Sequence, residues 1–352
     1  MVKVISLFSG CGGMDLGFLE AGFEIVYAND IDKDAIATYE ANFKVEVDKR
    51  SISTIKPENI PDADGIIGGP PCQSWSLAGS LKGEADPRGK LFYDYARIIE
   101  YKKPLFFVAE NVPGIISSRN REAFKRILSK LEEPGYRIEW RLLDSRDYCV
   151  AQERKRVIIV GIRNDLGIRY RFPAPICTKS GTSLDWYGSR KWLTLKDAIS
   201  DLPEPVPALS RNKTNESLRV PNHEYMIGPF SPIYMSRNRR RGWDEQSYTI
   251  QAGGRHAPLH PNSCAMCKVG EDKFEFTGPN YRRLSVRESA RVQGFPDSFI
   301  FKYRNVADGY KIIGNAVPPP LAKAIAESIF VSFTGARTLE AEEVGKNAVK
   351  RP

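Results

Sequence analysis

Short apolar runs alternate with amphipathic stretches through the first half of this chain, and this alternation constrains the fold more than any other feature of the sequence. The runs and stretches are residues 2–8, 14–21, 24–28, 33–42, 65–68, 92–101, 105–109, 121–131 and 157–162. Strand and helix patterns that alternate in this way are typical of βαβ units, in which helices connect parallel strands and cover both faces of a sheet. We therefore predict an α/β fold with a mostly parallel sheet.

Beyond residue 173 the pattern changes, because prolines, glycines and polar residues dominate as far as about residue 280 and no long amphipathic helix is predicted there. We predict a second, smaller domain of irregular or β-rich structure over residues 174–301, hinge included. Helical patterns return in residues 283–301 and 318–331. Residues 302–335 are expected to complete the first domain of residues 1–173, and residues 336–352 to form a disordered tail.

The formal net charge of +9 favours a polyanionic partner such as nucleic acid, although such an excess can also be only a solvated surface. No run of about 18 apolar residues is present to span a membrane, and residues 2–8 follow no charged leader. We expect a soluble cytoplasmic protein. The six cysteines are irregularly spaced, which favours reduced thiols over a disulfide framework.

A glycine-rich turn follows the first apolar run. Gly10 and Gly12 lie between a predicted strand and a predicted helix, where glycine lets the backbone approach a ligand and the helix offers free amide hydrogens. Asp15 stands where the dinucleotide fingerprint would have its third glycine, which disfavours a pyrophosphate cofactor.

Asp30 follows the second predicted strand, and an acid at that place in an open α/β sheet can accept hydrogen bonds from both ribose hydroxyls. The glycine turn and Asp30 together favour a nucleoside ligand that lacks a pyrophosphate. The alternative is a tight turn with a surface aspartate.

A cysteine and an acid follow two further predicted strands. Cys72 comes after residues 65–68 and a rigid pair of prolines, and Glu110 follows residues 105–109. Because parallel strands end at one edge of a sheet, where such sheets bind ligands, we expect the two side chains to lie close together. They suit a reaction in which a thiolate adds to carbon 6 of a pyrimidine while the acid supports charge at ring nitrogen 3. A buried cysteine without a catalytic role is the alternative.

Six short motifs occur in order along the chain: residues 8–13 (FSGCGG), 69–74 (GPPCQS), 110–112 (ENV), 152–156 (QERKR), 287–296 (RE, then QGFP) and 314–318 (GNAVP). Over residues 4–329 they resemble the motifs of the bacterial DNA cytosine-5 methyltransferases. The resemblance implies a Rossmann-like domain that binds S-adenosylmethionine, a smaller target-recognition domain, and double-stranded DNA as the substrate. The target base would be rotated out of the duplex.

The resemblance also implies roles for particular residues. Cys72 would be the nucleophile and Glu110 the acid, while Arg154 and Arg156 would lie beside the flipped cytosine and its phosphate, where positive charge favours a thiolate. The residues implied to contact S-adenosylmethionine are Phe8, Gly10, Gly12, Asp30, Ile31, Pro70 and Asn315.

The chain departs from the family pattern at two places. Arg50-Ser51 replaces a Gly-Asp pair whose acid meets the adenine amino group, so either Asp48 makes this contact or it is lost. Residues 148–151 (YCVA) replace a glycine and a proline ahead of Gln152, so we expect a different local turn.

Two stretches of the second domain carry arginines: residues 235–243 hold four, and residues 249–255 hold Arg255 beside two glycines. Guanidinium groups match the two acceptors on the major-groove edge of guanine, and they also bind phosphates. This region resembles the branch of the family that methylates the inner cytosine of GGCC, and another short G·C-rich palindrome is the alternative. The residues expected to contact DNA are Arg237, Arg239, Arg240, Gln251 and Arg255.

Four residues, His256, His260, Cys264 and Cys267, are spaced much like zinc ligands, but prolines interrupt the run and the family needs no metal. We expect no metal site.

Two other functions stay open at this point. A tRNA cytosine-5 methyltransferase would share these motifs, but the long arginine-bearing segment argues against it. A catalytically silent DNA-binding homologue would keep the fold, but the presence of both Cys72 and Glu110 argues against that. We expect a monomer, with a cognate restriction endonuclease as a second component of the same system.

Overall fold

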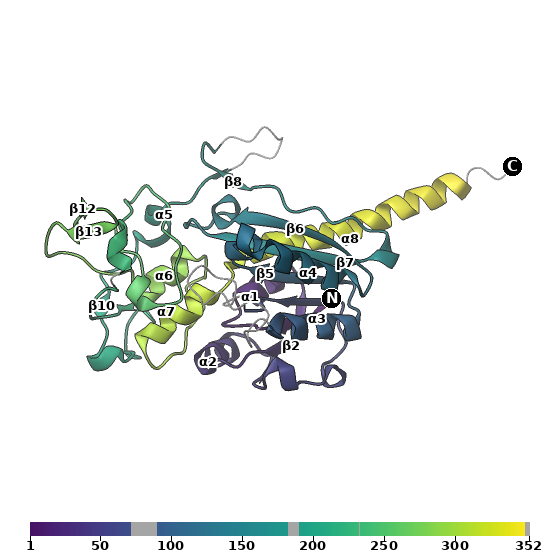
Figure 1. Ribbon diagram of the computed structural model, residues 1–352, viewed down its shortest axis with the longest axis horizontal. Helices are drawn as coiled ribbons and strands as arrows, with labels where there is room; N and C mark the ends of the chain where they lie inside the picture. The colour runs from purple at the N-terminus through teal and green to yellow at the C-terminus, as the bar shows by residue number, and fades with distance from the viewer. Residues whose placement is uncertain (72–89, 182–189, 232, 349–352) are drawn as a thin grey trace.

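A computed structural model describes residues 1–71, 90–181, 190–231 and 233–348, with side chains as far as residue 333 (Figure 1). At its centre lies a seven-stranded sheet with the strand order β3-β2-β1-β4-β5-β7-β6. The strands are β1 Lys3–Leu7, β2 Glu24–Asn29, β3 Val47–Asp48, β4 Gly65–Gly68, β5 Phe106–Asn111, β6 Tyr136–Asp144 and β7 Lys155–Arg163. The five strands β3, β2, β1, β4 and β5 run parallel, and β7 is antiparallel to both β5 and β6.

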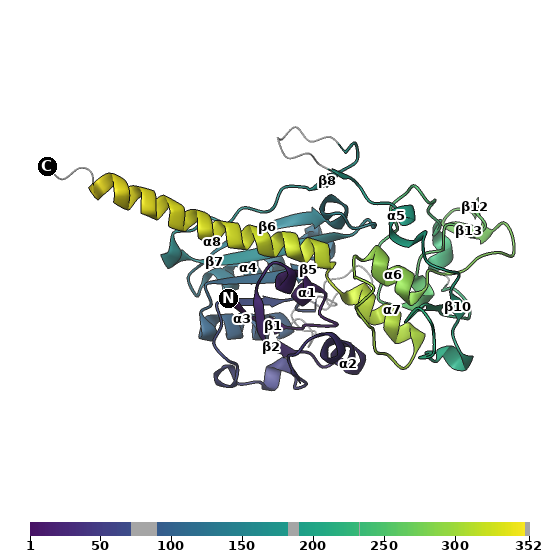
Figure 2. The same cartoon turned by 180° about the vertical axis from the view of Figure 1, so that it is seen from behind.

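Helices cover both faces of this sheet, as the sequence predicts (Figures 1 and 2). They are α1 Gly13–Glu20, α2 Lys33–Asn42, α3 Lys90–Lys102, α4 Arg121–Glu132 and α8 Pro319–Ala348. Side chains of α3 and α4 share one core cluster with Phe107, and side chains of α1 and α8 share another with Phe106. Adjacent residues of a strand point to opposite faces, so β5 contributes to both cores. The predicted α/β fold is confirmed.

Strand β6 was not expected from the sequence. It lies at the edge of the sheet, pairs only with β7 among the described strands, and leaves residues such as Trp140 and Arg141 exposed. Arginine and glutamate alternate there with apolar residues, so the segment lacks the continuous apolar run that marks the buried strands.

Residues 174–316, which we call the second region, are mostly irregular. Their strands are short: β8 Cys177–Thr178, β9 Arg190–Lys191, β10 Val206–Pro207, β11 Glu224–Tyr225, β12 Met266–Gly270 and β13 Lys273–Phe276. Their helices are α5 Leu195–Ile199, α6 Val286–Val292 and α7 Val306–Asn315. A separate core cluster joins Leu195, Ile250, Val286 and Ile312. The expectation of a smaller, irregular second unit agrees with this arrangement.

The chain returns to the sheet later than expected. Residues from Val306 to Ala316 pack in the core of the second region, and Val317 is the first residue of this stretch in a core cluster of the sheet. The structure therefore differs from the predicted return at residue 302. The reason is that α7 presents Val306, Tyr310 and Ile313 to α6 and its neighbours, a tertiary choice that helical periodicity does not reveal.

Helix α8 packs against α1 and then continues to Ala348, with its far end beyond the body of the molecule in both views (Figures 1 and 2). The expected disordered tail of residues 336–352 is thus helical over residues 336–348, and residues 349–352 lie outside the described part. Alanine and glutamate are common in residues 336–348 and proline is absent, so helix propensity supports the extension.

One expectation about the cysteines is wrong. Cys149 and Cys177 form a disulfide, with their Cα atoms 5.5 Å apart and a sequence separation of 28. Sequence spacing does not show which cysteines the fold brings together, so the pair could not be read in advance. Within the described part of the chain, Cys11, Cys264 and Cys267 are free thiols, and no helix is long and apolar enough to cross a membrane.

Candidate active site

A cavity of about 370 Å³ lies where the carboxyl ends of β1, β2, β4 and β5 meet, a size typical of small-molecule sites. The structure brings nine of the residues predicted from the sequence into its wall: Phe8, Gly10, Asp30, Ile31, Pro70, Glu110, Arg154, Arg156 and Asn315. Cys72 lies outside the described residues, which stop at Pro71 and resume at Lys90. Pro70 and Pro71, which lead to it, are part of the wall.

The turn after β1 holds unusual backbone conformations at the cavity. Phe8 and Gly10 have φ values of 55° and 56°, in the left-handed region. A non-glycine residue there costs on the order of 1–3 kcal/mol and is most often found at functional sites. A Cβ on Gly10 would meet no atom within 4 Å, so the backbone itself borders open space. The turn thus presents its main chain to the cavity.

Gly12 is not part of the cavity wall, unlike its neighbour Gly13. Its φ is 89°, and a Cβ there would lie 2.2 Å from a ring atom of Phe43. A Cβ on Gly13 would lie 2.4 Å from the carbonyl oxygen of Val317. Gly12 is therefore required for the turn and for close packing, and the structure does not bring it to the ligand position expected from the sequence.

Asp30 anchors the glycine turn. Its carboxylate accepts hydrogen bonds from the backbone N–H groups of Gly10 and Asp32, each at 2.8 Å. Burial raises the pKa of Asp30, an effect that these backbone donors oppose. Each carboxylate oxygen keeps a lone pair for a further donor. The next residue, Ile31, is 65% exposed and forms an apolar part of the wall.

Asp48 does not reach the cavity. Its carboxylate accepts hydrogen bonds from Arg50 Nη2 at 2.6 Å and from the Tyr27 hydroxyl at 2.7 Å, and the Arg50 guanidinium, assisted by Tyr27, lowers the pKa of Asp48 to about 2. Ser51 and Ile52 lie in the wall instead. Of the two alternatives left open by the sequence, substitution by Asp48 is not supported.

Asp15 is a buried carboxylate in the cavity wall that sequence reasoning treated only as a departure from a glycine motif. It accepts hydrogen bonds from the Ser6 hydroxyl at 3.0 Å and the Tyr39 hydroxyl at 2.7 Å. Burial raises the pKa of Asp15 to about 6, although both hydrogen bonds lower it. An acid within an otherwise small and apolar helix start was the signal in the sequence.

Glu110 and Arg156 form an ion pair in the wall. Arg156 Nε lies 2.7 Å from Glu110 Oε1, and each side chain is 11% exposed. Burial lowers the pKa of Arg156, and the nearby carboxylate of Glu110 opposes this effect. A Cβ on Gly69 would lie 3.4 Å from Glu110 Oε2, and Asn111 Nδ2 donates to the carbonyl oxygen of Pro70 at 3.2 Å. The acid therefore adjoins the loop that leads to Cys72.

Arg154 differs from the expectation that it would lie free beside a substrate. It is completely buried, and its guanidinium donates to the carbonyl oxygens of Ile250, Gly314 and Ala316 at 2.9–3.0 Å. Burial lowers the pKa of Arg154 well below its usual range. Its Nη1 and Nη2 groups join the start of β7 to Ile250 and to the end of α7 in the second region, so a structural role fits better than a phosphate contact.

Two buried glutamines form a junction that sequence reasoning did not single out. Gln152 Oε1 accepts from the backbone N–H of Ile250 at 2.8 Å, and Gln152 Nε2 donates to Gln293 Oε1. Gln293 Nε2 donates to the carbonyl oxygen of Ala316 at 2.8 Å. Both glutamines lie in the short motifs, and this was the only sequence signal for them. They connect the sheet, the second region and the loop before α8.

The family model for C-5 cytosine-specific DNA methylases matches residues 2–331. The chain belongs to this family. It is 56% identical to the Type II methyltransferase M.MthTI of Methanothermobacter thermautotrophicus over 338 residues, 95% of this chain and 98% of that protein. It is 50% identical to M.FnuDI of Fusobacterium nucleatum over 347 residues, 97% of this chain and 98% of that protein. These relatives come from an archaeon and a bacterium, so the similarity is not restricted to bacteria.

Solved structures support the fold of the methylase. A putative DNA modification methyltransferase encoded within a prophage of E. coli has a TM-score of 0.68 at 24% identity, covering 95% of this chain and all of that one. The Entamoeba histolytica methyltransferase EhMeth has a TM-score of 0.64 at 20% identity, covering 94% of this chain and 98% of that one. The Rossmann-like methyltransferase fold predicted from the motifs is confirmed. The methylase is a DNA cytosine-5 methyltransferase of the Type II kind, and its cofactor is S-adenosylmethionine.

The residues of the cavity fit this cofactor. The left-handed turn at Gly10 leaves room at the backbone, the Asp30 carboxylate keeps lone pairs for two hydroxyl donors, and Ile31 offers an apolar surface to a purine. Nothing in this arrangement requires a pyrophosphate. The methylase would hold the nucleoside between the ends of β1 and β2, next to Glu110 at the end of β5.

The arginines expected to contact DNA come together from two stretches of the second region. Arg239 and Arg255 both lie close enough to His256 to lower its pKa, after the larger effect of burial, and Arg237 lies near Arg239. Arg237 and Arg255 are exposed. We call Arg237, Arg239 and Arg255 the basic cluster. Their spacing in the sequence alone did not show that they lie together.

The remaining residues of this set have partners within the protein. Arg239 donates to the carbonyl oxygen of Tyr234 at 2.9 Å, and its guanidinium lies 4.9 Å from the centre of the Tyr234 ring. Arg240 donates to the carbonyl oxygen of Pro261 at 3.0 Å. Gln251 is exposed, and its backbone packs closely on Gly314: a Cβ on Gly314 would lie 2.3 Å from the Gln251 carbonyl carbon. These contacts hold the segment in shape.

The residues with zinc-like spacing are used in other ways. His256 Nε2 lies 3.1 Å from the Ser231 hydroxyl, and His260 Nδ1 accepts from the backbone N–H of Asn262 at 3.2 Å. Burial lowers the pKa of His260 to about 4, which the nearby Glu288 opposes. Across residues 1–71, 90–181, 190–231 and 233–348, no three histidine, cysteine or acidic side chains are grouped as metal ligands.

Proposed function

We propose that this methylase modifies carbon 5 of the inner cytosine of GGCC in duplex DNA, and that it does so through a covalent bond between the Cys72 sulfur and carbon 6. The observation that carries the proposal is the position of Glu110. Its carboxyl group adjoins Gly69 and is paired with Arg156, in the same cavity wall as the nucleoside-binding Asp30. This supports a site in which the acid, the loop before Cys72 and the cofactor meet.

The chemistry begins with a cytosine rotated out of the duplex, because its ring atoms are inaccessible inside the stack. The Cys72 thiolate adds to carbon 6, and the ring electrons move toward nitrogen 3, which Glu110 protonates. Carbon 5 is then nucleophilic. S-adenosylmethionine supplies an electrophilic methyl group. A base removes the hydrogen from carbon 5, the carbon–sulfur bond breaks, and Glu110 takes its proton back from nitrogen 3.

Arg156 is the residue that holds Glu110 for this role. A guanidinium offers donors in a fixed plane, so an ion pair with one carboxylate oxygen restricts the rotation of the other. Glu110 Oε2 is the oxygen nearer to Gly69. The pair therefore turns the carboxyl group toward the loop that carries Cys72.

The second region supplies target recognition in this proposal. Arg237 and Arg255 are exposed members of the basic cluster and contact guanine edges or phosphates, with Arg239 nearby. Residues 1–173 and the segment from Val317 onward form the catalytic domain, residues 174–316 the recognition domain, and DNA lies between them. The enzyme acts as a cytoplasmic monomer beside a cognate restriction endonuclease.

Bisulfite sequencing of plasmid DNA from cells that express the protein tests the target. We expect protected cytosines at the inner position of GGCC and nowhere else. Protection in another sequence context would replace the proposed target, and transfer of tritiated methyl groups to tRNA but not to duplex DNA would replace the proposed substrate.

Duplex DNA with 5-fluorocytosine at the inner position tests the covalent step, because fluorine at carbon 5 cannot leave as a proton. We expect a denaturation-resistant adduct with the wild type and none with Cys72→Ala. An adduct that survives Cys72→Ala would contradict the mechanism. Glu110→Gln should slow single-turnover methylation by roughly 10²-fold or more while duplex affinity changes much less; equal losses in both would remove its role as the acid.

A further inference from the structure

The disulfide lies between the active-site segment and the start of the second region. Cys149 ends the short helical turn η6, Ser145–Tyr148, three residues before Gln152. Its φ of 58° is in the left-handed region, where glycine is usual. Cys177 is in β8 and is completely buried. The bond therefore joins the turn ahead of Gln152–Arg156 to the chain that leaves the sheet.

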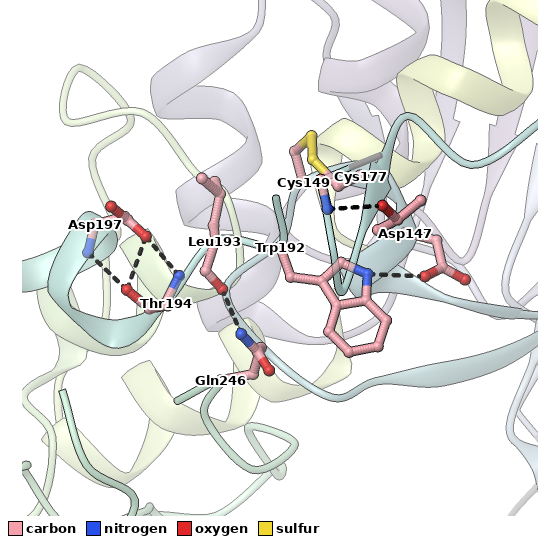
Figure 3. Close-up of a disulfide and its surroundings, with 10 residues drawn as sticks. Asp147, Cys149, Cys177, Trp192, Leu193, Thr194, Asp197 and Gln246 are labelled. Carbon is pink, nitrogen blue, oxygen red and sulfur yellow. Dashed lines mark hydrogen bonds between the residues drawn. A yellow bond between two sulfur atoms is a disulfide. The ribbon is translucent and has the colours of Figure 1, made fainter. Parts of the chain in front are cut away.

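Several hydrogen bonds around the disulfide also join η6 to the chain that leaves the sheet (Figure 3). The backbone N–H of Ile176 donates to the carbonyl oxygen of Asp147 at 2.8 Å, and the Tyr148 hydroxyl donates to that of Pro173 at 3.0 Å. Trp192 Nε1 donates to the Asp147 carboxylate at 3.1 Å, and the Arg146 guanidinium lies 4.4 Å from the centre of the Trp192 ring. Residues before β8 (Pro173 and Ile176) and after β9 (Trp192) are thus bound to η6.

Two sets of contacts continue from this junction to residues 241–246. The first runs through the backbone after Trp192: Gln246 Nε2 donates to the carbonyl oxygen of Leu193 at 3.2 Å (Figure 3), and the N–H of Leu195 donates to that of Glu245 at 2.9 Å. The second consists of ion pairs from Arg146 to Glu153 at 2.8 Å and from Glu153 to Arg241 at 3.3 Å. Both reach the residues that directly follow Arg237–Arg240.

We propose that the Cys149–Cys177 bond is a redox-dependent clamp that keeps residues 237–246 in position over the active-site segment 152–156. Its reduction weakens the binding of duplex DNA and leaves cofactor binding unchanged. The reason is geometric, because the bond and its contacts link η6 and Glu153 to the second region, while Asp30 follows β2, which β1, β4 and β5 separate from β7 in the sheet. The effect on DNA rests on the proposed role of the basic cluster.

The chemistry of the clamp is thiol–disulfide exchange. An external low-molecular-weight disulfide accepts two electrons from the two thiols, the sulfur–sulfur bond of the clamp forms, and two small thiols leave. A thiol or phosphine reductant reverses the step. Closing a loop of 28 residues lowers the entropy of the unfolded chain, so the oxidised form is also expected to be the more heat-stable one.

Peptide mapping tests whether the bond exists in solution. Protein blocked with N-ethylmaleimide under denaturing conditions without reductant and cut with trypsin should give one cross-linked pair, peptides 147–154 and 172–179, which separates after reduction. Recovery of both peptides as maleimide adducts from protein purified without reductant, and again after incubation with oxidised glutathione, would overturn the proposal whatever the function of the enzyme.

Binding measurements test the clamp, and activity is avoided as a readout because reagents for thiols also reach Cys72. Reduction of the wild type should lower Tm by roughly 5–10 °C and weaken binding to a GGCC duplex by roughly three- to tenfold, with the dissociation constant for S-adenosylmethionine unchanged. The Cys149→Gly variant, in which glycine suits the backbone, should behave like the reduced wild type and not respond to reductant. Cys264→Ser, which removes a free thiol of the second region, should respond as the wild type does.

The outcomes separate the clamp from the proposed function. Loss of heat stability without loss of duplex affinity on reduction would refute the clamp and leave the methylation proposal intact. Equal weakening of cofactor and duplex binding would refute it too, because the bond would then only support the fold. Absence of any duplex binding by the oxidised wild type would contradict the proposed function instead.

Discussion

Arg156 Nε lies 2.7 Å from Glu110 Oε1 in the wall of the cavity, and both side chains are 11% exposed. Removing one member of a buried ion pair leaves the other uncompensated. The pair joins the antiparallel strands β5 and β7, and this pairing brings the acid and the arginine together across the sheet. We therefore predict that Arg156 positions Glu110 through the planar fork of its guanidinium.

Replacing Arg156 with lysine keeps the charge and removes the fork. We expect the rate of single-turnover methylation to fall by about 10- to 100-fold, because Glu110 is then free to rotate, while the dissociation constant for S-adenosylmethionine changes less than about twofold. Arg163→Lys is the matched control, since Arg163 also lies in β7 and pairs with the exposed Asp165 at 2.7 Å. A similar loss in both variants would show only a general sensitivity of the strand.

The Asp48 carboxylate is occupied by Arg50 and Tyr27, which leaves Ser51 as the polar side chain at that part of the cavity wall. Ser51→Asp would place a carboxylate where an adenine amino group can donate to it. A hydrogen bond to a charged acceptor contributes about 1.5–3 kcal/mol when buried and less at an exposed position such as this one. We expect the dissociation constant for S-adenosylmethionine, measured by calorimetry, to fall by roughly three- to tenfold.

Ser51→Asn has nearly the same size without the charge and should change this constant by less than about twofold. An S-adenosylmethionine analogue that lacks the 6-amino group should bind equally to the wild type and to Ser51→Asp. Tighter binding of that analogue to the aspartate variant would mean that the gain comes from some other contact.

The pKa of Asp15 is raised by burial to about 6, above the value of 3.8 in an unfolded chain. An acid with a raised pKa in the folded state binds its proton more tightly there, so folding is favoured at low pH and this contribution is lost as the pH rises from about 4 to 6. At neutral pH the charged Asp15 lowers the free energy of unfolding by about 3 kcal/mol, from a shift of roughly two units at 1.36 kcal/mol each.

Asp15→Asn removes this charge and keeps an acceptor and a donor for Ser6 and Tyr39. The free energy of unfolding of the variant minus that of the wild type should therefore increase by on the order of 1 kcal/mol between pH 5 and pH 7.5, measured by urea denaturation. The exposed Asp244→Asn should show no such trend. A difference that decreases with pH would have the wrong sign for a raised pKa.

The strand ends were predictable from the sequence because parallel strands bring their carboxyl ends to one edge, and so Asp30 and Glu110 fall in one cavity. The role of Arg154 was not predictable, because its charge suggests a phosphate partner, whereas in the fold it binds the carbonyl oxygens of residues 250, 314 and 316. The Cys149–Cys177 pair and the position of α7 depend on packing between distant segments. Local pattern carries no information about such pairings, which tertiary contacts decide.

Arg255 and Arg240 have different surroundings and should have different effects on target choice. Arg255 is exposed in the basic cluster, whereas Arg240 donates to the carbonyl oxygen of Pro261 at 3.0 Å. Arg255→Lys keeps one positive charge but cannot bond both acceptors of a guanine, so discrimination at one position of GGCC should fall by about 10- to 100-fold in kcat/KM. The dependence of duplex affinity on salt should stay nearly the same, because the number of charges is unchanged. Arg240→Lys should lower Tm with little change in discrimination, and a uniform loss of affinity for all sequences in Arg255→Lys would instead identify Arg255 as a phosphate contact.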